Sequence, residues 1–149
     1  MAELTSAIGY TRPDGTPVFR ITIQGVLSAR HDFEAVLDTG FTGFVSMPLM
    51  DAFPLGLVLS GTESVLFANG AEENRLTAYG TVTVGPKSHK GAILLEPDSG
   101  EVLIGIQMLR NFNLSFLIDP VSNVVKLFDE TMTKRVLAIL SIEAEDKPK

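Results

Sequence analysis

The stretch Val36-Leu37-Asp38-Thr39-Gly40-Phe41-Thr42-Gly43 decides how this chain is interpreted. The apolar segment 33–37 predicts a buried strand, which leads directly into an acid, a hydroxyl and a glycine. Burying an ionised carboxylate costs on the order of several kcal/mol unless it is paired or shares a proton. Asp38 is therefore a candidate for chemistry. The alternative is a turn acid that caps backbone amides, and the residues around the tripeptide decide between the two.

Composition limits the classes of protein that the chain can belong to. The 149 residues, 45% of them hydrophobic, predict one domain over 1–142, followed by a charged tail over 143–149 that we expect to be disordered. The chain has no Cys, which excludes disulfides, thiol nucleophiles and Cys-based metal sites. A net charge of −6 argues against a nucleic-acid partner, which requires basic patches.

Targeting and metal signals are also absent from the sequence. Residues 1–6 show no basic region followed by an apolar stretch, and no apolar run approaches the roughly 20 residues of a membrane span. We therefore expect a cytoplasmic protein with no membrane partner. His31 and His89 are far apart in the sequence and have no third ligand, so we interpret both as surface residues and expect neither a metal nor a cofactor.

Short strands dominate the expected secondary structure. Thirteen Gly and eight Pro are scattered as turn residues, and residues 18–24 alternate between polar and apolar positions as a half-buried strand does. The strands that we expect cover 18–24, 32–38, 44–47, 57–67, 76–84, 92–95, 114–118 and 124–128. A helical turn is expected over 49–53 and the best helix over 106–112. The fold class is thus an all-β barrel with one short helix.

Two further segments have an open interpretation. Asn69-Gly70 predicts a hairpin between the strands over 57–67 and 76–84, because both residues tolerate positive φ. The run 136–142 is continuously apolar, and its periodicity does not separate a strand from a buried helix. We favour a strand there, either in the core or at a subunit interface, with the interface preferred.

Three features follow one another in a fixed order: a strand that ends in Asp38-Thr39-Gly40, a Gly-tipped hairpin at 67–76, and Leu103-Ile104-Gly105 before a short helix. This order resembles the retropepsin-like aspartic proteases, the one-lobe relatives of pepsin. The stretches 37–44 and 103–112 look more like the small bacterial branch than the viral enzymes. The resemblance covers about residues 16–128, and it implies a small closed or partly open β-barrel with one lobe per chain.

The resemblance implies a role for each residue of the main motif. Asp38 would be the catalytic carboxylate, and the Thr39 hydroxyl would bond across a dimer to brace two active loops. Gly40 would leave room for the substrate backbone. Phe41 and Thr42 would border the bound substrate, although viral relatives commonly have Ala and an acid at these positions.

Roles for the other two features follow from the same resemblance. Ile104 and Gly105 would pack beneath the active loop, where viral enzymes place an Arg after the glycine and this chain has Ile106. Substrate preference therefore does not carry over. The hairpin would be a flap that closes over a peptide, although its acidic residues at 72–73 also suit a plain surface hairpin. The flap residues would be Phe67, Ala68, Asn69 and Gly70.

The expected chemistry needs two acids. One carboxylate takes a proton from water while another donates one to the peptide carbonyl oxygen, and two carboxylates about 3 Å apart share a proton. The motif Asp98-Ser99-Gly100 is a possible second source, but no apolar strand precedes it, and we interpret it as a turn. The second acid would then be Asp38 of another copy, which requires a twofold homodimer.

The sequence therefore supports three hypotheses. The first is a homodimeric aspartic endopeptidase that hydrolyses a peptide or protein substrate. The second is a catalytically weak or inactive peptide-binding or scaffold dimer of the same fold, because a fold alone does not fix activity. The third is a chain that dimerises only with a partner or at high concentration.

Overall fold

A computed structural model describes residues 5–27, 29–98 and 100–140, so the predicted tail at 143–149 lies outside the described residues. The strands are β1 (Thr5–Thr11), β2 (Pro17–Gln24), β3 (Arg30–Leu37), β4 (Val45–Pro48), β5 (Val58–Leu66), β6 (Glu72–Val84), β7 (Lys87–Glu96), β8 (Val102–Ile104), β9 (Ser115–Asp119) and β10 (Val124–Phe128). The helices are α1 (Leu49–Ala52), the 3-10 turn η1 (Phe53–Leu55), α2 (Ile106–Asn111) and α3 (Glu130–Ile139).

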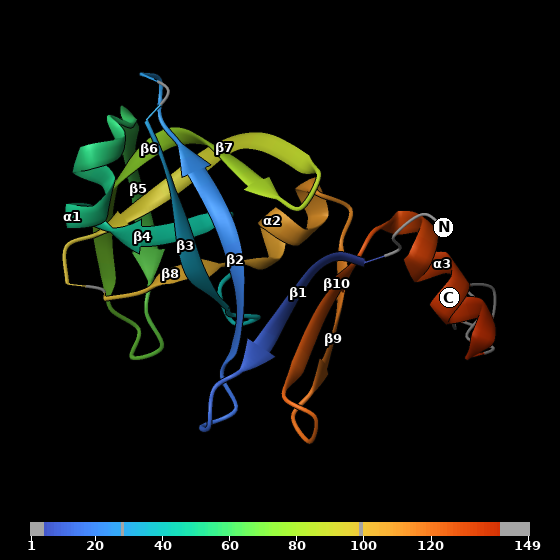
Figure 1. The fold of residues 1–149 in the computed structure, drawn as a ribbon. Helices are drawn as coiled ribbons and strands as arrows, with labels where there is room; N and C mark the ends of the chain where they lie inside the picture. The colour runs from blue at the N-terminus through green and yellow to red at the C-terminus, as the bar shows by residue number, and fades with distance from the viewer. Residues whose placement is uncertain (1–4, 28, 99, 141–149) are drawn as a thin grey trace, which may run out of the picture.

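Six of the strands close into a barrel, which confirms the predicted all-β fold class (Figure 1). The order around the barrel is β6-β7-β4-β8-β3-β2, and antiparallel pairing of β2 with β6 completes the circle. The β3–β8 and β4–β7 pairs are parallel. Closure satisfies the backbone groups that an open sheet would leave at its edges.

The barrel core follows the alternation seen in the sequence. Phe19, Ile21 and Ile23 of β2 are fully buried, whereas Arg20 between them is exposed. Their apolar partners come from every barrel strand, so one continuous hydrophobic core fills the interior. The expected helix at 106–112 is confirmed as α2, and the expected helical turn at 49–53 as α1 and η1.

The strand favoured for 136–142 is wrong over the described residues, because α3 occupies this region as a helix. Asp129 caps the helix by accepting a hydrogen bond from the Met132 amide at 2.8 Å. Met132, Val136 and Ile139 then recur at helical spacing. The cap lies seven positions before the apolar run begins, so a window centred on the run missed it. Residues 141 and 142 lie outside the described part of the chain.

Three strands stand apart from the barrel (Figure 1). β1 pairs with β2 only at Tyr10 and Thr11, and its earlier residues pair with β10, which in turn pairs with β9. Helix α3 follows β10 and lies at the far end of this small sheet (Figure 1). In the described ranges no helix has the length and apolar character needed to cross a bilayer.

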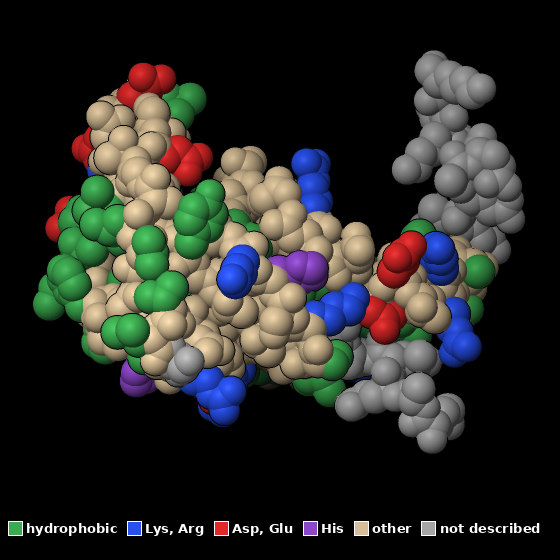
Figure 2. All heavy atoms as spheres, turned by 90° about the horizontal axis from the view of Figure 1, so that it is seen from above, with side chains coloured by type: hydrophobic (Ala, Val, Ile, Leu, Met, Phe, Trp, Pro, Cys, Tyr) green, Lys and Arg blue, Asp and Glu red, His purple; other side chains and the backbone are tan. Residues whose placement is uncertain are grey.

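Exposed apolar side chains gather on the opposite side of the molecule. Figure 2 shows them over the part formed by α1 and β5. The residues exposed there include Met50, Phe53, Val58 and Leu59. β5 is also an end of the strand order, because within the described residues it pairs with β6 alone. This side of the protein therefore combines an apolar surface with a free strand edge.

Candidate active site

Asp38 stands at the end of β3, directly after the buried residues Ala35, Val36 and Leu37. Its backbone amide donates to the Ile104 carbonyl oxygen at 3.0 Å, which continues the parallel pairing of β3 with β8. The Asp38 side chain is half-buried. The strand therefore fixes the backbone of the acid in the barrel wall while its carboxylate reaches the surface.

The Asp38 loop, residues 38–44, holds the carboxylate by a local bond. One carboxylate oxygen, Oδ1, accepts from the Gly40 amide at 2.9 Å, and the Asp38 carbonyl accepts from the Phe41 amide at 3.1 Å. Across the described ranges, the other carboxylate oxygen, Oδ2, has no hydrogen-bond partner. Thr39 and Gly40 are exposed. One oxygen is thus oriented and the other is open to a ligand or a proton.

The start of α2 crosses beneath this loop at very short range. The Ile106 amide donates to the Phe41 carbonyl at 2.9 Å, and the Gly105 amide donates to the Phe44 carbonyl at 3.0 Å. A Cβ atom at Gly105 would lie 2.2 Å from the Gly43 carbonyl oxygen, a distance that no real contact allows. Glycine is therefore required at 105, and Ile104 and Gly105 lie against the Asp38 loop.

Phe41 packs against the loop itself. A Cβ atom on Gly43 would lie 2.6 Å from two Phe41 ring carbons, and one on Gly105 would lie 2.8 Å from a third. The half-buried ring therefore covers these two glycines. The Thr42 side chain is exposed, and the Thr42 carbonyl accepts from the Gln107 amide at 3.3 Å. Of the two residues expected to border a substrate, one stabilises the loop and the other faces solvent.

The hairpin predicted from Asn69-Gly70 is confirmed. Its turn is closed by two backbone bonds, from the Phe67 amide to the Ala71 carbonyl at 2.8 Å and from the Gly70 amide to the Phe67 carbonyl at 2.9 Å. The Asn69 side chain accepts from the Ala71 amide at 2.9 Å, and Gly70 has a φ of +85° that favours glycine. Phe67 is half-buried and Ala68 is exposed.

Most of this hairpin extends beyond the barrel. Pairing of β6 with β7 ends at Leu76 and Leu95, so residues 63–75 form a ribbon of two strands, here called the projecting hairpin. Ala78 and Val82 lie on the inward face of β6. Because side chains alternate along a strand, Leu76 lies on the same face.

Sequence reasoning missed two apolar residues on this face. The face that carries Leu76 also carries Leu66, which pairs with Glu72, because successive side chains point to opposite sides. Leu66 is 69% exposed and Leu76 is 41% exposed, so both are available to a ligand. The alternation of β6 would have found them. Every second residue back from Ala78 reaches Leu76 and then Glu72, and Glu72 pairs with Leu66 across the turn.

Comparison with solved structures identifies the fold. The crystal structure of a retropepsin-like aspartic protease from Rickettsia conorii matches with a TM-score of 0.52 and 22% identity, over 87% of this chain and 97% of that chain. The fold is retropepsin-like. The solution structure of the Simian Foamy Virus (mac) protease also matches, with a TM-score of 0.42 and 18% identity, over 61% of this chain and 91% of that chain. No protein-family model and no curated protein sequence matches.

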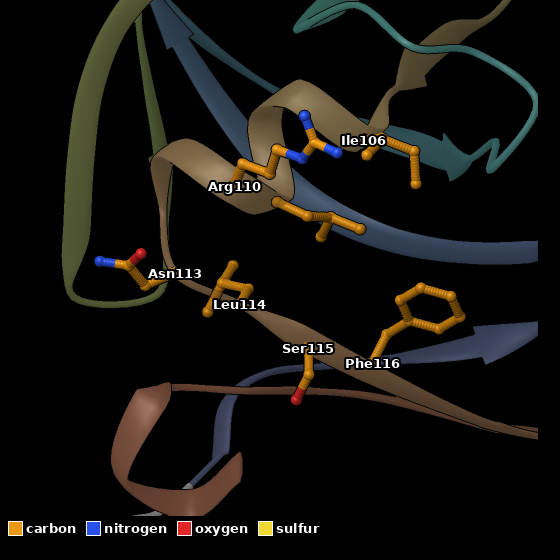
Figure 3. Close-up of a pocket in the computed structure, with 7 residues that line it drawn as sticks. Ile106, Arg110, Asn113, Leu114, Ser115 and Phe116 are labelled. Carbon is orange, nitrogen blue, oxygen red and sulfur yellow. The ribbon is translucent and has the colours of Figure 1, made fainter. Parts of the chain in front are cut away.

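A pocket of about 560 Å³ opens beside the site in this retropepsin-like barrel. Its lining residues include Ile106 and Arg110 of α2, Leu114 before β9, and Ser115 and Phe116 at the start of β9 (Figure 3). Asp38 does not line it. The pocket is joined to the Asp38 loop through Ile106, which directly follows Gly105. It therefore belongs to the side of the barrel where β9 and α2 meet.

The other residues considered as sites lie elsewhere in the retropepsin-like structure. Asp98 is exposed in the turn after β7, and Ser99 lies outside the described residues. His31 and His89 are both exposed on different strands, as expected of surface residues. The described ranges contain no group of three or more His, Cys, Asp or Glu residues suited to a metal ion.

Proposed function

We propose that this protein is a homodimeric aspartic endopeptidase whose catalytic pair is Asp38 from two copies. The observation that carries the proposal is the placement of Asp38 in a retropepsin-like fold. The acid ends a buried strand, one of its oxygens is held by the Gly40 amide, and the other oxygen has no partner among the described residues. This arrangement suits a carboxylate that exchanges a proton with bound water.

The chemistry requires the two carboxylates to share one proton, because like charges at about 3 Å cannot both ionise. The ionised carboxylate takes a proton from water as the water oxygen attacks the peptide carbonyl carbon. The protonated carboxyl gives its proton to the carbonyl oxygen, which yields a neutral tetrahedral diol. The diol then collapses: the acid that gave up its proton recovers one from a hydroxyl, the acid that took the water proton passes it to the amide nitrogen, and the C–N bond breaks.

The requirement for a second copy supports the dimer. Only a twofold axis places a residue beside its own counterpart, and the sequence has only one strand that ends in Asp-Thr-Gly. The surface beyond the barrel offers apolar side chains to a partner. Those exposed on β1, β9 and α3 include Ile8, Phe116, Leu117, Leu137 and Ile139.

The projecting hairpin supports an extended peptide as the substrate. Under this proposal it is the flap, and its exposed Leu66, with Leu76 at the base of the hairpin, supplies an apolar surface to the bound chain. A peptide in extended conformation can also bond to backbone groups of a strand. Phe67, Ala68, Asn69 and Gly70 form the flap tip, and the Thr39 hydroxyls brace the two loops across the axis.

Peptide cleavage by Asp38→Asn tests the proposal, with Asp98→Asn as the matched control. Wild type and both variants are incubated with a random peptide library from acid to neutral pH, and products are read by mass spectrometry. We expect Asp38→Asn to reduce cleavage by about 10²–10⁴-fold, the usual contribution of a general acid or base. Asp98→Asn, in an exposed turn, should cleave as wild type does.

Light scattering of the same samples separates the alternatives. A dimer that persists in Asp38→Asn while cleavage is lost supports the enzyme. A wild-type dimer that binds peptides without cleaving them would assign the inactive binding role instead. A particle that stays strictly monomeric at micromolar concentration would overturn the shared pair.

A further inference from the structure

Arg75 lies where the projecting hairpin leaves the barrel. The register of β6 and β7 pairs Leu76 with Leu95, which places Arg75 opposite Glu96 at the next position. Beyond this point β6 is paired with β5 alone. A ribbon of two strands is only marginally stable in water, so its position relative to the barrel depends on what holds its base.

The Arg75 side chain contacts three different parts of the molecule. Its Nε donates to the Glu96 carboxylate at 2.7 Å, and a terminal nitrogen donates to Glu73 at 2.5 Å. The guanidinium carbon lies 5.3 Å from the centre of the Phe67 ring, within the range of a cation–π contact. One side chain thus joins the end of β7, the ribbon and the turn at the tip.

Burial makes this cluster different from an ordinary surface ion pair. The side chains of Arg75 and Glu96 are 13% and 18% exposed, whereas those of Lys134 and Glu130 on α3 are 75% and 63% exposed. Water screens an exposed pair almost completely, but it screens a partly buried, hydrogen-bonded pair much less. The hydrogen bonds to Glu96 and Glu73 raise the pKa of Arg75.

We propose that Arg75 is a positioning residue that fixes the angle of the projecting hairpin and so presents Leu66, on the same face as Leu76 at the hairpin's base, to the bound peptide. The proposal rests on the proposed function. Arg75 pairs with Glu63, so it lies on the face of the ribbon opposite to these leucines and does not touch the substrate. It acts only by holding the ribbon against Glu96.

The first test is hydrogen exchange of the free protein, which needs no activity. Arg75→Gln is compared with wild type and with the control Lys134→Gln, which removes the cation of the exposed pair on α3. We expect Arg75→Gln to speed exchange of the hairpin amides at 66–74 about tenfold, within the range of coupling between contacting residues. The amides of β2 should exchange as before, which separates a local release from global unfolding.

The second test is kinetic and uses a peptide that wild type cleaves. Loss of a binding surface that acts equally on substrate and transition state raises KM and leaves kcat unchanged. We expect Arg75→Gln to raise KM about tenfold with kcat within about twofold. Arg75→Lys should recover part of the loss, because it keeps the charge without the fork of donors. Glu96→Gln combined with Arg75→Gln should be no worse than Arg75→Gln alone.

The two tests fail in different ways. Unchanged exchange at 66–74 in Arg75→Gln overturns the positioning role, whatever the activity. Faster exchange with an unchanged KM also overturns it, because the hairpin would then not serve the substrate. Faster exchange in a protein whose wild type cleaves no peptide supports Arg75 as the residue that holds the hairpin and counts against the proposed function alone.

Discussion

The Asp38 loop and the projecting hairpin are built in opposite ways. The loop is held by backbone bonds to the segment from Ile104 to Gln107, at a spacing that leaves no room for one extra carbon at Gly105. The hairpin is an exposed ribbon that continues β5 and β6, and the side chain of Arg75 adds a contact from the ribbon to the end of β7. Backbone bonds resist substitution of most side chains, whereas a side-chain link is lost with one residue. Mutations in the loop should therefore change the free energy of unfolding. Mutations in the hairpin should instead change its local motion and its binding of ligands.

Gly105→Ala should give the largest effect. The new methyl group would lie 2.2 Å from the Gly43 carbonyl oxygen, and both segments are backbone that cannot move aside alone. We expect a loss of at least about 4 kcal/mol in the free energy of unfolding, at the extreme of single substitutions. Urea denaturation measures it. Gly100→Ala is the control, because a Cβ there meets nothing within 4 Å and should change stability by less than about 0.5 kcal/mol.

Two half-buried phenylalanines compare the regions directly. Phe41 covers glycines of the loop, whereas Phe67 lies at the tip of the hairpin under Arg75. Phe41→Ala should lower the free energy of unfolding by about 2 kcal/mol, less than a fully buried ring because part of it is already in water. Phe67→Ala should lower it by less than about 0.5 kcal/mol, because the ribbon opens without the barrel. Urea denaturation of both variants measures the two losses. Equal losses of unfolding free energy would contradict the difference between the loop and the hairpin.

Leu66→Ser should affect binding and spare stability. Leu66 is 69% exposed in the free protein, so its replacement removes little packing. If a peptide covers it, the lost apolar contact of roughly 1 kcal/mol raises KM about fivefold. The measurement is the KM of a cleaved peptide beside the unfolding midpoint. Leu59→Ser changes an exposed leucine near the start of β5, where that strand pairs with Ala78 of the barrel strand β6; it is the matched control and should leave KM unchanged.

The smallest expected effect on stability comes from the turn between β9 and β10, where the Asp119 side chain accepts hydrogen bonds from within the turn. The Ser122 hydroxyl and the Val121 and Ser122 amides hold the pKa of Asp119 below its ordinary value. A lowered folded-state pKa stabilises the protein above the unfolded pKa of about 3.9, and this contribution disappears as the pH falls through the folded pKa. Asp119→Asn should therefore be slightly less stable than wild type at pH 7, and the gap should close as the pH falls through the folded-state pKa of Asp119. A gap that widens in acid would contradict this origin.

Local sequence signals predicted the parts whose partners lie close by. Alternation over 18–24 predicted β2, Asn69-Gly70 predicted the hairpin, and the strand into Asp38 predicted the loop. Each of these signals is complete within a few residues, because a strand face or a turn depends on its own side chains. The same holds for α2, whose start follows directly from Ile104-Gly105.

The elements that the sequence did not predict depend on residues that are distant in the chain or lie just outside the segment that carried the pattern. β1 owes its strand form to β10, which lies more than a hundred positions later. The Arg75–Glu96 contact depends on where β7 ends, and no pattern in residues 72–75 indicates it. Helix α3 has a local signal, the cap at Asp129, but the apolar run at 136–142 favoured a strand when it was considered without that cap. Pairing partners and the ends of strands are tertiary information, which one sequence contains only indirectly.

The bond between the Asp38 amide and the Ile104 carbonyl has a consequence for synthesis of the chain. The acid emerges from the ribosome long before the segment that supports it, because β8 and the start of α2 come after most of the barrel has been made. A nascent chain that ends before residue 104 has the Asp-Thr-Gly sequence but lacks the support that fixes its loop. The acid is therefore placed only when the barrel that carries it is nearly complete.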